Sequence, residues 1–231
     1  MAPLPAADDA HGPAFHAAAP AVRTPGVRLT PAPRGRLRPT RPLCLASASP
    51  RRQELLAVYG LHCRVVPAHV DESPRPGEAP AEHVLRLARA KARDVAARVE
   101  GLGILSGDTI VEVDGVLLGK PADAADVARM LRRLAGRTHR VITAYALLDP
   151  RTGACGGRSV VTNVTFRALP AEWIAWYAAL SEPLDKAGAY AVQGVGGAMI
   201  ERIDGSYTNV VGFPIEHIVW DMLASGWVEL C

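Results

Sequence analysis

Hydrophobic and polar positions repeat with two different periods along the chain, and each period predicts one kind of element. Short apolar runs that end in small residues, such as residues 43–47, predict buried strands. In residues 79–99 the apolar positions recur at helical spacing between arginines and glutamates, which predicts an amphipathic helix. The same reasoning predicts strands at residues 62–67, 102–113, 116–118, 139–148, 158–167, 188–193 and 198–203, and helices at residues 50–59, 122–134, 170–180 and 214–223.

Residues typical of helix ends and turns separate these elements. Ser49 fits an N-cap before Pro50, and Gly60 fits the end of that helix. The dipeptide at residues 114–115, Asp-Gly, is typical of a two-residue hairpin turn, and Pro121 is expected to open the helix that follows. Because strands and helices intermix while several adjacent strands form hairpins, we expect the α/β class, with a mixed twisted sheet flanked by helices.

Residues 1–41 differ in composition from the rest of the chain. They hold 8 of the 19 prolines, runs of alanine and few large apolar residues, so they cannot bury enough surface to offset ordering entropy. We therefore expect a disordered extension rich in Pro, Ala and Arg at 1–41, followed by one folded domain at 42–231. A transit peptide is the alternative, but this stretch has no serine and carries Asp8 and Asp9.

Charge and hydropathy exclude several functional classes. The net charge of +3 divides into +4 for residues 1–41 and −1 for residues 42–231, which argues against a dedicated nucleic-acid binder. No apolar run reaches the roughly 20 residues of a membrane span, so we expect no membrane association and a cytoplasmic location. The four cysteines lack any CxxC pair, so neither a zinc site nor a disulfide framework is predicted.

The junction between the first strand and the first helix is a candidate phosphate site. A helix N-terminus offers unpaired N–H groups, and small residues allow an anion to approach closely. Two hydroxyls and two guanidiniums add donors at this junction, from Ser47, Ser49, Arg51 and Arg52. A simply capped helix with solvated arginines explains the segment equally well.

Asp108 is the second candidate, because it interrupts the apolar strand at residues 102–113. A carboxylate in such a position is costly unless it is paired, bound to a metal or placed at the open end of the strand. It could hold Mg²⁺ or accept a proton from water. A structural aspartate that bonds to loop amides is the alternative.

Lysine usage gives a third signal. Only Lys91, Lys120 and Lys186 are lysines among the 26 basic residues, so arginine supplies most of the positive charge in this chain. A lysine ammonium is a compact charge that can lie against a phosphate without bidentate geometry. Chance placement is the alternative, and it is strongest for Lys91 within a helix.

Two glycine-rich segments, residues 193–197 and 205–214, could bind a ligand or form hairpin loops. The first partly matches a dinucleotide-binding pattern, but no strand, turn and helix surround it, so that function is rejected.

Together, five segments resemble the motifs of the Maf family in the family's order: Leu45–Arg52, Gly107–Val111, Gly119–Pro121, Asp185–Gly194 and Gly205–Pro214. The resemblance covers residues 43 to about 225, and residues 1–41 have no counterpart in it. It implies a nucleoside triphosphate pyrophosphatase that depends on a divalent cation, with two lobes around a deep cleft and a homodimeric assembly.

The resemblance also implies residue roles. Asp108 matches the catalytic proton acceptor, and Arg51, Thr109 and Gln193 match positions tied to substrate choice, with identities similar to the branch that acts on dTTP and UTP. Asp108 and Glu72 would hold Mg²⁺ or Mn²⁺. Phosphate charge would be neutralised by Lys91, Lys120, Lys186 and Arg51, assisted by Ser47, Ser49 and Arg52.

Two alternatives stay open at this point. One is an enzyme that favours 7-methyl-GTP or another modified nucleotide. The other, from a different class, is a nucleotide-binding regulator of cell division without physiological catalysis.

Overall fold

A computed structural model describes residues 36–231 of the chain. The part of the expected extension at residues 1–35 lies outside the described residues. Leu37–Pro39 nevertheless form strand β1, which pairs antiparallel with β10 (Val228–Leu230), so the folded region begins before residue 42. No helix within the described range combines the length and the apolar character that crossing a membrane requires.

The main sheet has eight strands and confirms the expected mixed α/β architecture. Its path is β3-β2-β4-β6-β8-β9, with β5 paired to β4 and β7 paired to β6. Strand β2 is parallel to β3 and β4, whereas the other pairings are antiparallel. The strands are β2 (Leu43–Leu45), β3 (Cys63–Val65), β4 (Gly103–Val113), β5 (Val116–Leu118), β6 (Thr138–Leu148), β7 (Cys155–Gly156), β8 (Ser159–Phe166) and β9 (Ile200–Asp204).

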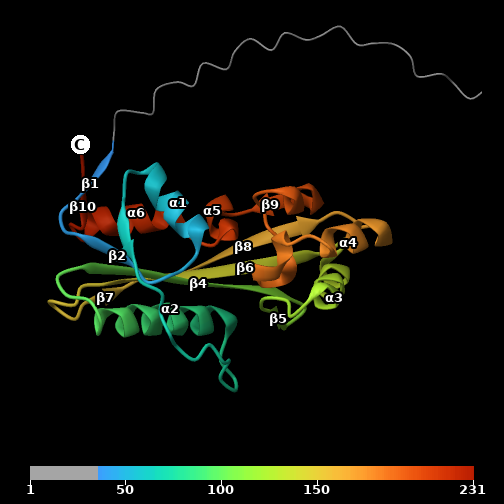
Figure 1. The fold of residues 1–231 in the computed structure, drawn as a ribbon, viewed down its shortest axis with the longest axis horizontal. Coiled ribbons are helices and arrows are strands. Elements are labelled where there is room, and N and C mark those ends of the chain that lie inside the picture. The colour runs from blue at the N-terminus through green and yellow to red at the C-terminus, as the bar shows by residue number, and fades with distance from the viewer. Residues whose placement is uncertain (1–35) are drawn as a thin grey trace, which may run out of the picture. The chain divides into compact units, whose positions relative to one another are not determined.

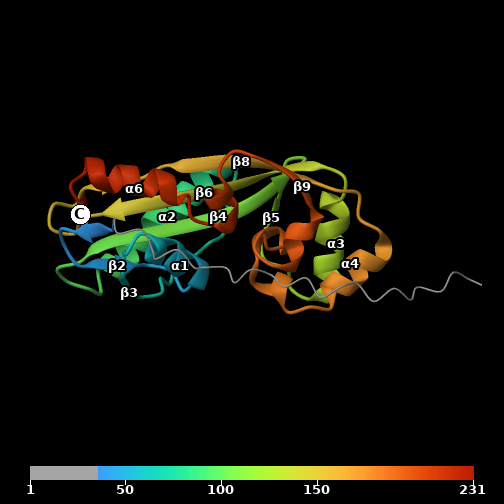
Figure 2. The same ribbon diagram turned by 90° about the horizontal axis from the view of Figure 1, so that it is seen from above.

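Helices cover both faces of this sheet and one of its ends. Figure 1 shows α2 on one side of the long strands β4, β6 and β8, and α1 and α6 on the other side. Figure 2 shows α3 and α4 beyond the far end of α2, next to β5. The helices are α1 (Pro50–Val58), α2 (Pro80–Ala96), α3 (Ala124–Leu134), α4 (Ala171–Ala178), α5 (Tyr207–Val211) and α6 (Ile215–Ala224), and three short 3-10 helices are η1 (Glu182–Asp185), η2 (Ala187–Ala189) and η3 (Val195–Met199).

Three clusters of buried side chains form the core. One lies between the sheet and α1 and α6, and includes Leu56 and Ile218. A second lies between the sheet and α2, where Val84 and Ala88 sit on the buried side of the amphipathic helix. The third joins α3, α4 and the far part of β8, and is built around Phe166. Two of the clusters thus flank the sheet at one end and the third lies at the other end, which agrees with the expected two lobes.

Most predicted elements are confirmed, with boundary shifts of a few residues. The helix expected from Pro121 begins instead at Ala124, because the Asp123 carboxylate accepts from the backbone N–H of Asp126 at 2.8 Å and caps the helix there. The strand expected at residues 188–193 is wrong. Gly188 and Ala189 have φ of +71° and +60°, which an extended strand does not allow.

The sequence does not predict helix α5, because the glycine-rich residues 205–214 favour turns that bind a ligand or form a hairpin loop. Ser206 caps this helix by accepting from the backbone N–H of Asn209 at 2.9 Å, and Gly212 ends it with φ of +114°. The segment therefore folds as a short capped helix rather than as a hairpin loop.

Candidate active site

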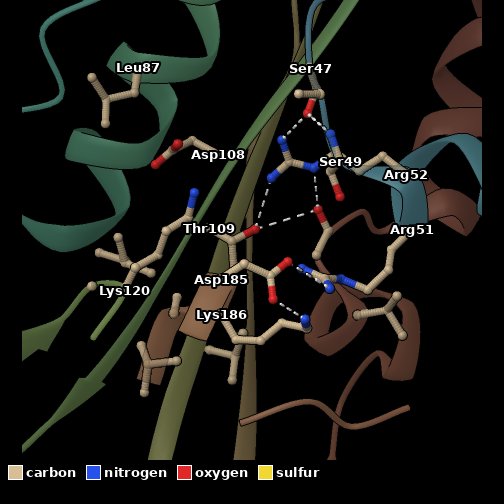
Figure 3. Close-up of a pocket in the computed structure, with 18 of the residues that line it drawn as sticks. Ser47, Ser49, Arg51, Arg52, Leu87, Asp108, Thr109, Lys120, Asp185 and Lys186 are labelled. Carbon is tan, nitrogen blue, oxygen red and sulfur yellow. Dashed lines mark hydrogen bonds and ion pairs between the residues drawn. The ribbon is translucent and has the colours of Figure 1, made fainter. Parts of the chain in front are cut away.

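A cavity of about 810 Å³ opens between the two ends of the sheet, and it gathers every candidate site residue. Its lining comes from α1, α2, β4, β5, β6, α5, η1 and η2, together with the loops that follow β2, β3, β5 and η2. Figure 3 shows how side chains from these elements face one another across the cavity. The candidate residues in its wall are Ser47, Ser49, Arg51, Arg52, Glu72, Lys91, Asp108, Thr109, Lys120, Lys186 and Gln193.

Strand β4 presents Asp108 and Thr109 to opposite faces of the sheet, because side chains alternate along a strand. Asp108 shares the α2 face with Ser106, whose hydroxyl donates to the Ala88 carbonyl of α2 at 2.6 Å. Thr109 shares the α1 face, where its hydroxyl lies 3.2 Å from Arg52 Nη2. A single strand therefore supplies both a carboxylate and a hydroxyl to the cavity, from its two faces.

Lys91 pairs with two carboxylates of the cavity, Asp108 and Glu72. Lys91 Nζ, on α2, lies 2.6 Å from Asp108 Oδ1 and 2.6 Å from Glu72 Oε1. Asp108 is only 7% exposed, so this ammonium compensates a nearly buried charge. Burial alone would raise the pKa of Glu72, but its hydrogen bond to Lys91 and the nearby positive charges lower it overall. Lys91, the lysine for which chance placement was the strongest alternative, is thus at the centre of the carboxylate cluster.

Arg52 forms a hydrogen-bonded framework on the opposite face of β4. Its guanidinium donates to the carbonyls of Gly212 and Gly107 at 2.9 and 2.6 Å, and to the hydroxyls of Ser47 and Thr109 at 3.0 and 3.2 Å. Burial lowers the pKa of Arg52, and the negative charge of Asp108 partly offsets this effect. These bonds occupy four of the five guanidinium N–H groups. Arg52 therefore ties β2, β4 and α5 together, and direct substrate binding by this residue stays a prediction.

The N-terminus of α1 faces the same cavity. Ser49 occupies the N-cap position and Pro50 the first turn, as predicted, but the Ser49 side chain makes no capping hydrogen bond within the described residues. The Ser49 backbone N–H instead donates to Ser47 Oγ at 3.3 Å. The Ser49 hydroxyl and the first N–H groups of the nine-residue helix are consequently placed to meet an anion.

Asp185 links two of the candidate cations. It pairs with Arg51 at 3.5 Å and with Lys186, whose Nζ also donates to the Glu182 carbonyl at 3.1 Å. Burial would raise the pKa of Asp185, whereas Lys186 and Arg51 lower it overall. Asp185 was missed by the sequence analysis, although its position beside Lys186 in a recognised motif could have indicated it. The pair joins α1 to η1 across the cavity.

Lys120 and Gln193 are both exposed and line the cavity wall. Across residues 36–231, neither side chain has a hydrogen-bond or ion-pair partner within the protein. Both are therefore free to contact a ligand.

The positions of the Glu72 and Asp108 carboxylates are suited to binding a hard divalent cation. Their carboxylate oxygens converge on the single Lys91 Nζ atom, so both can reach one small positive centre. Among the described residues no cluster of three or more His, Cys, Asp or Glu side chains suits a metal ion. Mg²⁺ commonly takes one or two protein carboxylates and completes its shell with water and substrate phosphates, so the two carboxylates are the ligands to consider.

The cavity combines a helix N-terminus, lysines and arginines from several elements, and a nearly buried carboxylate. This combination is typical of proteins that bind a small phosphorylated molecule. The family of Maf-like proteins matches residues 42–225 of this chain. The chain belongs to the Maf family.

Curated relatives support this assignment. A dTTP/UTP pyrophosphatase of Geobacter metallireducens is 51% identical over 184 residues, which are 80% of this chain and 96% of that protein. A protein of the same name from Geobacter sulfurreducens has the same identity and coverage. One from Myxococcus xanthus is 50% identical over 177 residues, 77% of this chain and 89% of that protein.

Proposed function

We propose that this protein is a nucleoside triphosphate pyrophosphatase that hydrolyses dTTP and UTP to the monophosphate and pyrophosphate. The observation that carries this proposal is the cavity itself, which sets the nearly buried Asp108 among Lys91, Lys120, Lys186 and Arg51. Relatives at about 50% identity that carry the name dTTP/UTP pyrophosphatase support the same activity and the same substrates.

In this mechanism Asp108 accepts the proton of the water that attacks the α-phosphorus. A positioned carboxylate contributes through general base catalysis, and the hydrogen bond from Lys91 fixes the orientation of this one. Negative charge then builds on the departing pyrophosphate. Lys120, Lys186 and Arg51 stabilise that charge, because preorganised cations cost little reorganisation during the reaction.

We propose that Asp108 and Glu72 would hold a divalent cation, Mg²⁺ or Mn²⁺. When bound, such an ion neutralises phosphate charge and lowers the pKa of a coordinated water. The support is the convergence of both carboxylates on one Nζ atom and the demand of Mg²⁺ for few protein ligands.

Recognition of the base is assigned to Gln193, whose amide offers one acceptor and two donors. Such a group can pair with the acceptor and donor edge of a uracil or thymine ring. Arg51 and Thr109, at the other positions tied to substrate choice, lie on the α1 side of the cavity. The homodimer, the cytoplasmic location and the absence of nucleic-acid binding stay predictions.

The test is a nucleotide panel with Mg²⁺ in which pyrophosphate and orthophosphate are measured separately. Pyrophosphate release, fastest from dTTP and UTP, is expected. Asp108→Asn should lower kcat by about 10²- to 10⁴-fold, the range that general base catalysis supplies. The matched control is Asp114→Asn, which changes an exposed aspartate in the β4–β5 turn and should leave the rate unchanged.

Other outcomes of the panel would replace the proposal. Orthophosphate as the first product would exclude a pyrophosphatase. Equal or greater efficiency on 7-methyl-GTP would favour an enzyme for modified nucleotides. Binding without turnover would favour a regulator of cell division.

A further inference from the structure

The segment that carries Gln193 has no regular secondary structure of its own to fix it. Residues 190–194 connect η2 to η3, and Gly194 precedes η3 with φ of +105° and without a side-chain cap. Ala191, Val192 and Gln193 nevertheless form part of the cavity wall. The position of the Gln193 amide therefore depends on whatever holds the two ends of this segment.

Glu182 holds the C-terminal end. Its carboxylate accepts from the backbone N–H groups of Val195 and Gly196 at 3.1 and 2.9 Å. It also accepts from the Tyr177 hydroxyl at 2.8 Å, so two oxygens receive three donors. Burial would raise the pKa of Glu182, but these donors lower it overall, which favours the ionised acceptor.

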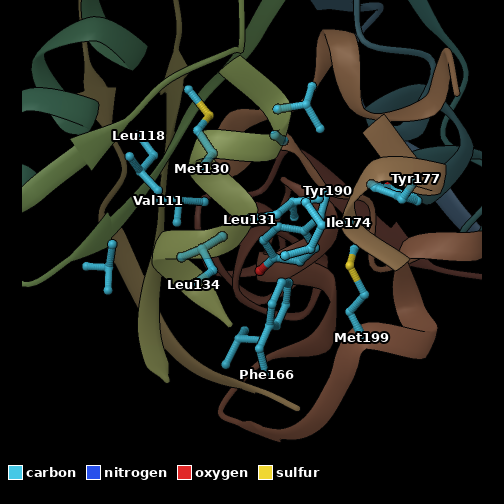
Figure 4. Close-up of a cluster of buried hydrophobic side chains, with 14 of the residues drawn as sticks. Val111, Leu118, Met130, Leu131, Leu134, Phe166, Ile174, Tyr177, Tyr190 and Met199 are labelled. Carbon is cyan, nitrogen blue, oxygen red and sulfur yellow. The ribbon is translucent and has the colours of Figure 1, made fainter. Parts of the chain in front are cut away.

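Tyr177 holds the N-terminal end. Its hydroxyl accepts from the backbone N–H of Ala191 at 3.3 Å while it donates to Glu182. The tyrosine ring is fully buried in the hydrophobic cluster drawn in Figure 4, close to Ile174. Because α4 and this cluster fix the ring, the hydroxyl is a stationary anchor. We call Glu182 and Tyr177 together the clamp.

The glycines of the segment are explained by the clamp. A Cβ on Gly194 would lie 2.5 Å from Glu182 Oε2, and a Cβ on Gly196 would lie 2.6 Å from the Tyr177 hydroxyl. Only glycine allows the backbone to approach both groups this closely. Two glycines of the segment that partly matches a dinucleotide-binding pattern, Gly194 and Gly196, therefore allow contact with a carboxylate and a phenol.

We propose that Glu182 and Tyr177 are positioning residues that hold Gln193 against the nucleobase and so determine base discrimination. This inference rests on the proposed function, since it assumes that Gln193 reads a pyrimidine. Neither member of the clamp lines the cavity, so both act through the backbone of residues 191–196.

The experiment compares Glu182→Gln and Tyr177→Phe with the wild-type protein, and Glu172→Gln serves as the matched control. Glu172 is an exposed glutamate in the first turn of α4 that does not line the cavity. The measured quantity is the ratio of kcat/KM for UTP to kcat/KM for CTP. The bases of these two nucleotides differ in the hydrogen-bond donors and acceptors that they present to a side-chain amide. Glu182→Gln should lower this ratio by at least about tenfold, through KM more than kcat, because charge-assisted bonds to the loop are lost.

A double-mutant cycle with Gln193→Ala separates positioning from a general structural role. In that background Glu182→Gln should change the ratio by less than about twofold, since the residue through which it acts is gone. An equal loss in both backgrounds, or an unchanged ratio in the single variants, would overturn the proposal. If Glu182→Gln does not fold, Tyr177→Phe is compared in the same two backgrounds, and the same changes in the ratio support or overturn the proposal.

A second measurement does not depend on the proposed function. Hydrogen exchange of the Val195 and Gly196 amides should be at least about tenfold faster in Glu182→Gln than in wild type or Glu172→Gln. Unchanged exchange would contradict the clamp. If exchange changes but the wild-type protein does not release pyrophosphate from UTP, the proposed function fails while the clamp itself stands.

Discussion

Arg51 and Arg52 are adjacent in sequence, and the structure predicts opposite consequences for the same substitution at each. Arg52 donates four hydrogen bonds to protein acceptors, from three separate elements of the fold. Arg51 has one ion pair, at 3.5 Å, to an Asp185 side chain that is 61% exposed. Lysine at either position keeps the charge but removes the planar fork of donors.

The expected magnitudes follow from those contacts. A hydrogen bond to a charged group contributes about 1.5–3 kcal/mol, and lysine at position 52 loses at least two of the four. Arg52→Lys should therefore lower the free energy of unfolding by about 4 kcal/mol. An exposed ion pair contributes about 0–1 kcal/mol, so Arg51→Lys should cost less than about 1 kcal/mol.

Urea unfolding followed by circular dichroism measures both effects. With a slope of about 2 kcal/mol per molar urea, Arg52→Lys should lower the midpoint by about 2 M and Arg51→Lys by less than about 0.5 M. In the nucleotide assay Arg51→Lys should raise KM by about tenfold, because bidentate phosphate contact is lost. An unfolding midpoint for Arg52→Lys equal to that of wild type, accompanied by a raised KM, would refute the framework role of Arg52.

Two further substitutions have expected outcomes. Asp185→Asn removes the carboxylate partner of Arg51 and Lys186, so inhibition by the product pyrophosphate should strengthen several-fold. Unchanged inhibition would argue that Asp185 does not compete with phosphate for these two cations. Burial lowers the pKa of His139 from 6.5 to about 4, so as pH falls through this window the unfolded chain binds a proton more readily and stability is lost. From pH 7.5 to 4.5 the wild-type protein should lose about 2 to 3 kcal/mol more than His139→Gln in urea unfolding, and equal losses would contradict the buried neutral imidazole.

The sequence indicates which residues belong to the candidate site, but it does not indicate how these residues are arranged in space. An apolar run with a carboxylate inside it predicts a strand and marks Asp108 as unusual, and both expectations hold for β4. Alternation along that strand also implies that Asp108 and Thr109 face opposite sides. Which elements cover the two faces depends on the order of the strands and on the packing of α2 and α1, which hydrophobic periodicity does not encode. The contact of Lys91 with Asp108 could therefore not be derived from spacing.

The elements that sequence reasoning missed depend on distant or unusual backbone contacts. Strand β1 exists because Leu37 pairs with Leu230 at the other end of the chain, and a three-residue run gives little local signal. The strand predicted at residues 188–193 fails because Ala189 adopts φ of +60°, which propensity does not foresee for alanine. The neighbouring Gly188 lies against Val111, where a Cβ would come within 2.8 Å, so this tertiary contact requires glycine at position 188.

The charges around the cavity also indicate which part of the site must change when a triphosphate binds. Each cluster already contains a carboxylate beside its cations: Asp108 and Glu72 beside Lys91, and Asp185 beside Arg51 and Lys186. Phosphate oxygens can bind these cations fully only where the competing carboxylate can move into water. Asp185 and Glu72 are each 61% exposed, so at little cost Asp185 can turn into water and Glu72 can turn from Lys91 toward the proposed divalent cation, whereas Asp108 is nearly buried and keeps its place. Substrate binding should therefore rearrange the exposed carboxylates and leave the proposed base fixed, which is the arrangement that a positioned proton acceptor requires.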